Sequence, residues 1–450
     1  MTNTKQATAL GTEPIHKLLI RYAVPAIIAM TAASLYNIVD SIFIGQGVGP
    51  MAITGLALTF PLMNLAAAFG SLVGVGAATL ISVKLGQKDY ATAQRVLGNV
   101  LVLNVILGLA FSLVVFPLLT PILYFFGASE ATIGYASDYM EIILLGNIIT
   151  HLYFGLNAVL RSSGNPQQAM YATICTVVIN ALLDPLFIYV FQWGIRGAAI
   201  ATIVAQLLSL LWQLYFFSNP NRLLHFHRGI FKLKRRIVVD SLAIGLSPFL
   251  MNTAACFIVI LINQGLKRHG GDLAIGAYGI VNRLVFIVVM IVMGFNQGMQ
   301  PIAGYNFGAR LYPRVERVLK LNIFCATCVT TFGFLVGELF PEAVVSIFTT
   351  DPDLIARSAR GLRITVIFFP IIGFQMVTAN FFQSIGMASK SIILSLSRQL
   401  LILLPCLLIL PIFFQEEGVW YSMPASDLLA SLIALFMLLQ QLKQFKQEKV

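Results

Sequence analysis

The chain consists of long apolar runs separated by short polar segments. About 20 apolar residues are needed to cross the hydrocarbon core of a bilayer, and each run reaches that length. The pattern predicts twelve membrane-spanning helices, at 18–44, 51–83, 93–119, 137–160, 168–191, 197–217, 237–265, 273–303, 314–340, 359–382, 390–412 and 418–442. Many contain glycine or proline, which membrane helices tolerate where neighbouring groups satisfy the freed carbonyls. We therefore expect an all-α membrane protein.

The composition supports this interpretation and excludes several classes. Hydrophobic residues make up 58% of the 450 residues and charged residues 10%, against about 45–50% and 25% in soluble domains. The five cysteines all lie in expected spans, and an odd number there is not a disulfide framework. The C-x-x-C at Cys325–Cys328 fits an apolar helix face better than a metal or redox site.

The chain has no G-x-x-x-x-G-K-[ST] motif, which excludes an ATP-driven pump of the P-loop type. We expect no enzymatic activity and no cofactor.

The basic residues predict the orientation of the chain. If the loops alternate across the membrane, 21 of the 29 Lys and Arg fall on one side and 6 on the other. Loops rich in Lys and Arg stay in the cytoplasm, so both termini are expected there. The basic stretch 225–236 then fits a cytoplasmic linker better than a nucleic-acid site. We expect a monomer in the plasma (inner) membrane that contacts lipids and binds no nucleic acid.

An internal repeat divides the chain. The segment 84–97 aligns with 306–319, and R-S-S-G at 161–164 aligns with Q-S-I-G at 383–386. The numbering offset is 222 residues in both cases, and the same shift places Gly76 on Gly298. Chance resemblance would not keep one register across two separate loops.

The repeat predicts an N-terminal lobe at 1–218, a cytoplasmic linker at 219–236 and a C-terminal lobe at 237–450. Each lobe holds six spans, and an even number returns the chain to the same side. The repeats should therefore be parallel and related by a pseudo-two-fold axis along the membrane normal. This is a transporter architecture, with a substrate path between the halves.

Two carboxylates lie deep inside apolar runs. Asp40 belongs to the first span and Asp184 to the fifth. A charge at the centre of a bilayer costs roughly 2.5–3.5 kcal/mol or more, so an intramembrane acid is by default a candidate functional residue. Counting along the helices places both acids, with Thr202 of the sixth span, at similar depth in the outer half of the N-terminal lobe.

The neighbours of the two acids are polar. Asn180 lies one turn before Asp184, and Tyr36 and Asn37 share the helix face of Asp40. Burial and mutual repulsion would both favour protonation, so the pair could hold one proton near neutral pH. The oxygens of Asp40, Asn180, Asp184 and Thr202 could equally coordinate Na⁺. The sequence leaves H⁺ and Na⁺ both open.

Weaker candidates for a substrate site or a polar network are Tyr36, Asn37, His151, Asn282 and Arg283. A lone histidine inside a span is more often a packing residue than a proton carrier. Arg283 could face a central cavity or bond to carbonyls. Pro25 and Pro185 share helices with the two acids and are the prolines most suited to act as hinges.

Three motifs carry a family resemblance. They are G-Q-K-D-Y-A-T-A at 86–93, R-S-S-G-N-P at 161–166 and N-A-L-L-D-P at 180–185. Together with the duplicated twelve-span layout, they resemble the multidrug and toxic compound extrusion (MATE) family over nearly the full chain. The resemblance points to the DinF/MepA-like branch, named for a DNA-damage-inducible protein.

The resemblance implies a cation site in the N-terminal lobe formed by Asp40, Asn180, Asp184 and Thr202. It also implies that the first helix bends at Pro25 when its acid changes protonation. Another branch places acids on the seventh and tenth helices, but 241–265 and 364–382 contain no Asp or Glu. The repeat places Ile262 and Cys406 at the positions equivalent to Asp40 and Asp184, so a cation site in the C-terminal lobe is not expected.

The sequence thus predicts a secondary active exporter that expels amphipathic, cationic compounds in exchange for H⁺ or Na⁺. One alternative is a lipid-linked saccharide flippase of the same superfamily, which would need several cavity arginines, whereas only Arg283 and Arg398 lie deep within spans. Another is a symporter of the major facilitator type, whose D-R-x-G-R signature is absent.

Overall fold

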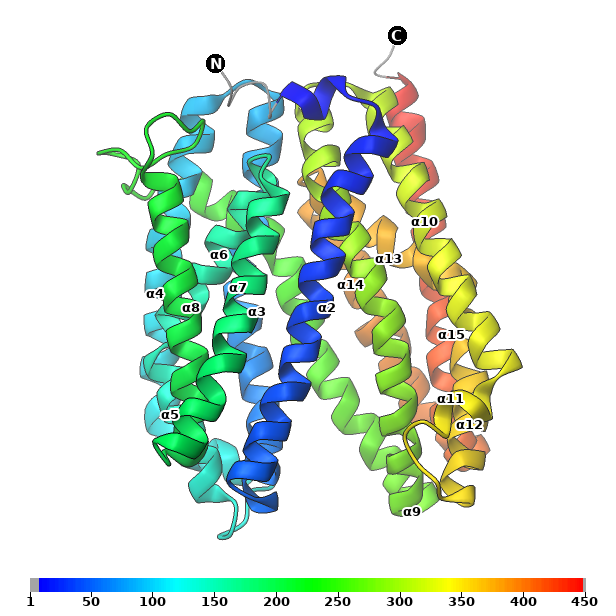
Figure 1. The fold of residues 1–450 in the computed structure, drawn as a ribbon. Helices are drawn as coiled ribbons and strands as arrows, with labels where there is room; N and C mark the ends of the chain where they lie inside the picture. Colours follow the sequence, from blue (N-terminus) through cyan, green and yellow to red (C-terminus); the bar gives the residue numbers. More distant parts are fainter. Residues whose placement is uncertain (1–7, 448–450) are drawn as a thin grey trace. The chain divides into compact units, whose positions relative to one another are not determined.

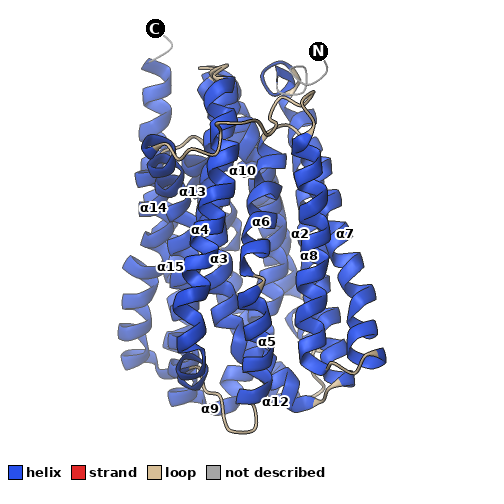
Figure 2. Cartoon of the chain, turned by 90° about the vertical axis from the view of Figure 1, so that its left-hand side faces the viewer, coloured by secondary structure: helices blue, strands red, loops and turns tan. Residues whose placement is uncertain are grey.

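The structure is a computed structural model that describes residues 8–447. The described part of the chain contains helices and connecting loops and no strand (Figure 2). The helices of the first half are α2 (Ile15–Gly47), α3 (Pro50–Gly86), α4 (Tyr90–Phe125), α5 (Ile133–Leu145), α6 (Asn147–Ser162), α7 (Pro166–Pro185), the π-helix η1 (Leu186–Val190) and α8 (Gly194–Ser218).

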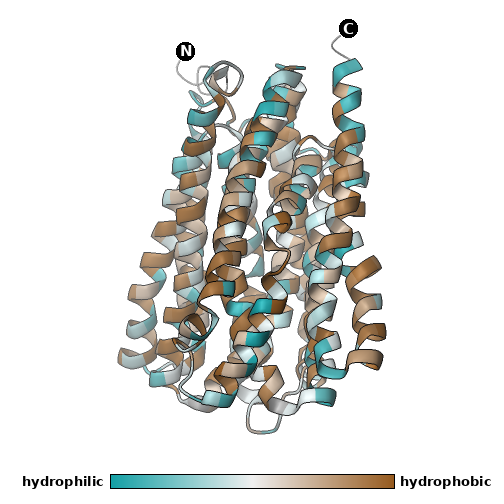
Figure 3. Ribbon diagram, turned by 90° about the vertical axis from the view of Figure 1, so that its right-hand side faces the viewer, coloured by the Kyte–Doolittle hydropathy of each residue, from teal (hydrophilic) through white to brown (hydrophobic). Residues whose placement is uncertain are grey.

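The helices of the second half are α9 (Arg235–Gly308), α10 (Tyr312–Leu339), α11 (Pro341–Val345), α12 (Pro352–Val366), α13 (Phe369–Ser384), α14 (Ala388–Leu396), the π-helix η2 (Ser397–Leu403) and α15 (Leu404–Gln447). Apolar positions predominate along the helices, and polar ones gather near their ends (Figure 3). The chain is an integral, multi-pass membrane protein.

Two of the long helices each contain two spans. Helix α9 breaks at Gly271, which has a φ of 71°. Helix α15 breaks at Gln415, with a φ of 53°. A Cβ on Gly418 would lie 2.4 Å from the Leu410 carbonyl carbon, although residues eight apart in a straight helix are about 12 Å apart. The chain therefore folds back at Gln415, and the twelve expected spans are present.

Two spans expected to be continuous are sharply bent. Helices α5 and α6 together form the fourth span and meet at 57°, and α12 and α13 form the tenth and meet at 55°. At the first bend, a Cβ on Gly146 would lie 2.4 Å from Ile203 Cδ1, so the glycine allows α8 to pass close by. At the second, Pro370 stands in the first turn of α13, where it cannot donate to a continuing helix.

The helix ends confirm the repeat. Applying the repeat offset to α6 reproduces both ends of α13, and α4 and α10 begin at the equivalent Tyr90 and Tyr312. The left-handed residues also correspond, with Lys88 matching Arg310 and Gly164 matching Gly386. The two-repeat fold is therefore visible in local geometry as well as in sequence.

The chain packs as two compact units. The first unit contains Ile28–Phe249 with the described residues before Glu13, and the second contains Glu13–Ile27 and the chain from Leu250 onward. In the first unit α3 packs against α4 and α6, and α7 packs against α8 (Figure 1). The lobe boundaries that the repeat predicts, at 218 and 237, remain a prediction.

The two units exchange equivalent segments. The repeat equivalent of Glu13–Ile27 is 235–249, the start of α9, which belongs to the first unit. Each repeat therefore contributes the beginning of its first helix to the unit formed by the other repeat. The prolines Pro25 and Pro248 lie close to the points where α2 and α9 pass from one unit to the other.

Glycines allow the exchanged segments to pack backbone to backbone. In the first unit, a Cβ on Gly245 would lie 1.7 Å from the Leu72 carbonyl oxygen, and one on Gly76 would lie 1.8 Å from that of Ser241. In the second unit, a Cβ on Gly298 would lie 2.6 Å from Ala23 Cα. Gly298 and Ala23 are the repeat equivalents of Gly76 and Gly245, so the same crossing occurs in both units.

The segment between the repeats is held against α4 by one asparagine. The Asn99 side chain is buried, and its Nδ2 donates to the carbonyl oxygens of Ile230 and Lys232, both at 3.2 Å. Its Oδ1 accepts from Lys234 N at 3.1 Å. Gln94 adds a bond from Nε2 to the His225 carbonyl at 2.5 Å. A single amide thus satisfies three backbone groups of the connecting segment.

We expect Asn99→Ala to release this segment, because three backbone groups lose their partner at a cost of about 1 kcal/mol each. Limited trypsin digestion of the purified protein should then cleave within 222–236 at least about fivefold faster. Arg95→Ala, at an exposed position one turn earlier, is the control and should leave the cleavage rate unchanged. Equal rates for both variants would show that other contacts hold the segment.

Candidate functional site

The structure brings Asp40 and Asp184 together inside the first unit. Asp40 comes from α2 and is 5% exposed, and Asp184 comes from the end of α7 and is fully buried. Their carboxyl groups lie within hydrogen-bonding reach of each other. One oxygen of each, Oδ1, has no hydrogen-bond donor among the described residues. One shared proton or one bound cation can satisfy such acceptors on neighbouring carboxyl groups.

Asn180 and Thr202 complete the cluster. With its amide nitrogen toward Asp184, Asn180 donates from Nδ2 to Asp184 Oδ2 at 2.9 Å, and its Oδ1 accepts from Thr202 N at 2.9 Å. The opposite orientation would place the amide oxygen against the carboxylate. The Thr202 hydroxyl also donates to the Ala198 carbonyl at 3.1 Å. Asn180 therefore connects α7 to α8 and fixes Asp184.

Two tyrosines border the acids. The Tyr36 hydroxyl lies 2.8 Å from Thr202 Oγ1, so this side chain of α2 reaches α8. Tyr139 of α5 is 2% exposed and lies close enough to interact electrostatically with Asp40 and Asp184. The sequence does not single out Tyr139, because a tyrosine in an apolar run is indistinguishable from a packing residue. The one feature of the sequence that could have indicated Tyr139 is its depth, near the outer end of its span and therefore close to the level of the two acids.

The other residues expected on the face of Asp40, or in a wider network, lie elsewhere. Asn37 is exposed, and among residues 8–447 it donates to the Ala33 carbonyl of its own helix, at 3.1 Å. Asn282 and Arg283 belong to the second unit, where both are exposed. None of the three joins the acid cluster.

The two hinge candidates differ in their surroundings. Pro25 lies inside the continuous helix α2, where it removes one backbone donor without ending the helix. Pro185 ends α7 directly after Asp184, and the chain continues as the π-helix η1. Since π-helical turns interrupt the regular hydrogen-bond ladder, the backbone next to Asp184 is irregular.

His151 is a buried packing residue of α6. Its Nε2 donates to the Ala66 carbonyl at 3.0 Å, and its Nδ1 has no partner among the described residues. Glycines flank the ring on two helices: a Cβ on Gly70 would lie 3.4 Å from the ring, and one on Gly108 would lie 3.3 Å from Nδ1. A charged imidazole would leave a buried N–H unpaired here, so the site suits the neutral ring.

In the second repeat, the large and the small residue at the positions of His151 and Gly108 are interchanged between the two helices. The equivalent of His151 is Gly373, and the equivalent of Gly108 is Thr330. A Cβ on Gly373 would lie 2.9 Å from Thr330 Oγ1. The larger side chain comes from α6 in the first unit and from α10, the equivalent of its neighbour α4, in the second unit. This exchange of size is typical of residues that fill space between helices.

We expect His151→Gln to retain efflux, because a glutamine amide can replace the Nε2 donor to the Ala66 carbonyl. His151→Ala should lose about 2–4 kcal/mol of stability through the cavity and the unpaired carbonyl. Dye efflux across a pH series compares the glutamine variant with the wild-type protein, and the two profiles should coincide. A folded glutamine variant without efflux would assign His151 a proton-carrying role.

The cluster offers carboxylate, amide and hydroxyl oxygens in a buried site. The ligands available from Asp40, Asp184, Asn180 and Thr202 are hard oxygen atoms. Within 8–447 no group of three or more His, Cys, Asp or Glu is placed to hold a metal ion. Two donor-free carboxylate oxygens in this setting fit a shared proton, and the same oxygens fit a small hard cation.

A helical membrane fold built from two repeats, with an acid pair buried inside one packing unit, is a transporter architecture. The sequence model of the family described as MatE matches residues 25–186 and again residues 244–408. The chain therefore belongs to the MatE family, whose members are transporters.

Relatives of known name are similar over almost the whole chain. The multidrug export protein MepA of Staphylococcus haemolyticus is 28% identical over 422 residues, covering 94% of this chain and 93% of the relative. A structure of the MATE multidrug transporter DinF-BH is 37% identical, with a TM-score of 0.89 and 96% coverage of both chains. The structure of a MATE protein in the bent conformation shares the fold, with a TM-score of 0.93, 24% identity and 99% coverage of both chains.

Proposed function

We propose that this protein is an antiporter that exports amphipathic, cationic compounds in exchange for H⁺ or Na⁺. The observation that carries the proposal is the buried Asp40–Asp184 pair with its two donor-free oxygens. MepA and DinF-BH, which are similar over more than nine-tenths of this chain, are described as multidrug transporters. Their names support the export of several small-molecule compounds.

The proposed mechanism rests on competition for the acid pair. When Asp40 and Asp184 hold an ion, the cluster is less negative and binds a cationic compound less tightly. Ion binding from the outside would therefore favour release of the compound there, and a bend of α2 at Pro25 would accompany it. Pro185 and η1 would let the backbone beside Asp184 adjust. No cofactor and no enzymatic step are required.

The available driving force is sufficient for export. One charge moving through 100 mV supplies about 2.3 kcal/mol. At about 1.4 kcal/mol per tenfold change, this sustains a substrate gradient of roughly 50-fold. We further propose that the protein is a monomer in the plasma (inner) membrane. Both termini would be cytoplasmic, because 21 of its 29 Lys and Arg then face the cytoplasm.

Dye uptake into inverted membrane vesicles, the equivalent of efflux from cells, tests the proposal. A gradient of protons, acid inside, and a gradient of Na⁺, high inside, are imposed separately without ATP. We expect one of them to drive accumulation of a cationic dye and thereby to name the coupling ion. If neither gradient drives accumulation of the dye, the result would contradict antiport.

A further inference from the structure

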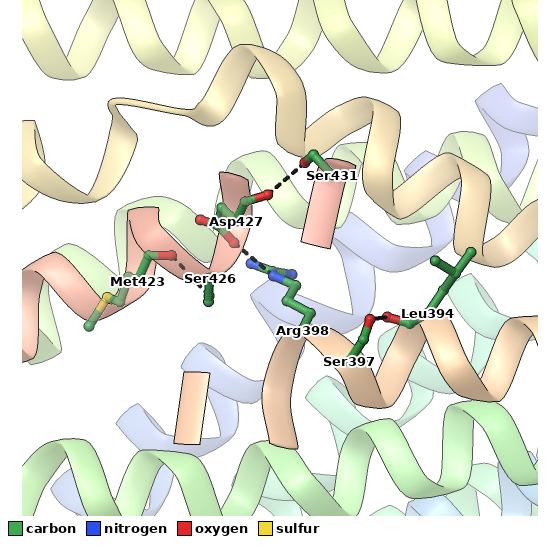
Figure 4. A network of polar contacts seen from close by, with 7 residues as sticks. All are labelled: Leu394, Ser397, Arg398, Met423, Ser426, Asp427 and Ser431. Atoms are coloured by element: carbon green, nitrogen blue, oxygen red, sulfur yellow. Dashed lines mark hydrogen bonds and ion pairs between the residues drawn. The ribbon is translucent and has the colours of Figure 1, made fainter. Parts of the chain in front are cut away.

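A second charged pair lies inside the spans of the second unit. Arg398 of η2 donates from Nε to Asp427 Oδ1 of α15 at 2.8 Å (Figure 4). Arg398 follows the start of α14 by ten residues, and Asp427 follows the break at Gln415 by twelve. At a rise of 1.5 Å per residue, each lies about 15 Å or more inside its span. Charged side chains at this depth almost always face the interior of a helical bundle or a water-filled cavity.

Part of the hydrogen-bonding capacity of this ion pair is not used by the protein. The Asp427 side chain is 4% exposed, whereas that of Arg398 is 32% exposed. Of the five N–H groups of the guanidinium, only that of Nε has a partner among residues 8–447. The terminal Nη1 and Nη2 groups remain as donors in a fixed fork, the geometry that matches a carboxylate.

The backbone around Arg398 is irregular. The seven-residue π-helix η2 starts at Ser397, and such turns are frequent at functional sites. On the next residue, Gln399 Oε1 is buried without a hydrogen-bond donor among the described residues. The turn therefore carries polar groups whose hydrogen-bonding capacity the protein leaves unused.

The repeat shows that the fold does not need this ion pair. Arg398 and Asp427 lie on the pair of helices equivalent to α7 and α8, where Thr176 and Ala205 occupy their positions. There, Thr176 Oγ1 donates to Ser209 Oγ at 2.6 Å. A neutral hydroxyl contact thus joins the two helices in the first unit, so the charges in the second unit require another explanation.

We propose that Arg398, oriented by Asp427, binds the carboxylate of zwitterionic substrates. The pair is already neutral overall, so a plain anion would meet the charge of Asp427. A zwitterion can place its carboxylate on the Nη edge of Arg398 and its cationic group nearer to Asp427. This inference rests on the proposed export function and adds to it a subsite that binds a substrate carboxylate.

The test uses two dyes that differ only at the carboxyl group: rhodamine B, which is zwitterionic, and its ethyl ester, which is a cation. Binding to the purified full-length protein is measured by fluorescence polarisation at neutral pH. Arg398→Gln should weaken rhodamine B binding about tenfold or more, the effect of losing a charge-assisted hydrogen bond. Binding of the ester should stay within about twofold.

Controls separate recognition from folding. Arg363→Gln, at an exposed position of α12, should bind both dyes like the wild-type protein. Arg398→Lys keeps the charge without the fork and should give an intermediate loss for rhodamine B alone. If Arg398→Gln does not fold, the lysine variant provides the same comparison.

Equal weakening for both dyes, or no weakening for either, would overturn the proposal. The outcome is separable from the export function, because uptake of the ester dye into vesicles does not depend on Arg398. Failure of ester uptake by the wild-type protein would contradict export while leaving the dye comparison intact.

Discussion

Replacing Asp184 by asparagine is expected to abolish dye uptake driven by an ion gradient, to the level of vesicles without the protein. Asparagine keeps the size of the side chain but can neither release a proton nor carry the negative charge that attracts a cation. Its amide would also donate permanently to Asp40, whose Oδ1 has no donor among the residues described. Asp40→Asn should have the same effect from the other side of the pair.

The matched control is Asp138→Asn. Asp138 is an acid of the same unit, but it is exposed and paired with Arg196 at 2.6 Å. An exposed ion pair of this kind contributes about 0–1 kcal/mol, so this variant should transport like the wild-type protein. Full uptake in both Asp184→Asn and Asp40→Asn would remove the acid pair from the mechanism.

The largest effect on stability is expected from Gly245→Ala. The added Cβ would lie 1.7 Å from the Leu72 carbonyl oxygen, and a backbone atom cannot rotate away as a side chain can. The start of α9 would have to separate from α3, at a cost of more than about 3 kcal/mol. Thermal unfolding of the purified protein should show a much lower midpoint and reduced yield.

Gly279→Ala, in the second span of α9, is the control, because a Cβ there meets nothing within 4 Å. Gly279 is exposed and helical, so alanine should be neutral or slightly stabilising. If Gly245→Ala unfolds at the same temperature as Gly279→Ala, the close packing of α9 on α3 does not contribute to stability.

Much of the fold could be predicted from the sequence. Apolar runs of sufficient length indicate the spans, and the constant offset between matching segments indicates the repeat, because both are properties of local sequence. The bends at Gly146 and before Pro370 could not be predicted, because a glycine or proline inside a membrane helix is compatible with a straight helix, a kink or a break. The exchange of Glu13–Ile27 and 235–249 depends on tertiary packing, which periodicity does not report.

The candidate site was predictable where helix spacing sufficed. Asp184 and Asn180 share a face at i, i−4, and counting depth brought Asp40 and Thr202 to the same level. Asn37 lies three positions from Asp40, yet its side chain is exposed and donates to the Ala33 carbonyl of its own helix, so helix spacing alone does not place a residue in the cluster. Tyr139 comes from a helix that the sequence does not link to the acids.

The two repeats carry different chemistry on equivalent helices. The equivalents of Asp40 and Asp184 in the second repeat are the buried Ile262 and the half-buried Cys406, so the acid pair has no counterpart there. The second repeat instead carries Arg398 and Asp427, with Arg398 about two turns away from the position of Cys406. Duplication thus preserved the backbone, while the polar side chains diverged.

The central claim is that substrate and coupling ion compete for the Asp40–Asp184 pair. The most direct test is the release of ions when a cationic dye is added to the purified protein, measured as a pH change in weak buffer or as displaced radioactive Na⁺. The wild-type protein should release about one ion per dye bound. The variant with both Asp40→Asn and Asp184→Asn should release none, and equal release from that variant would contradict the claim.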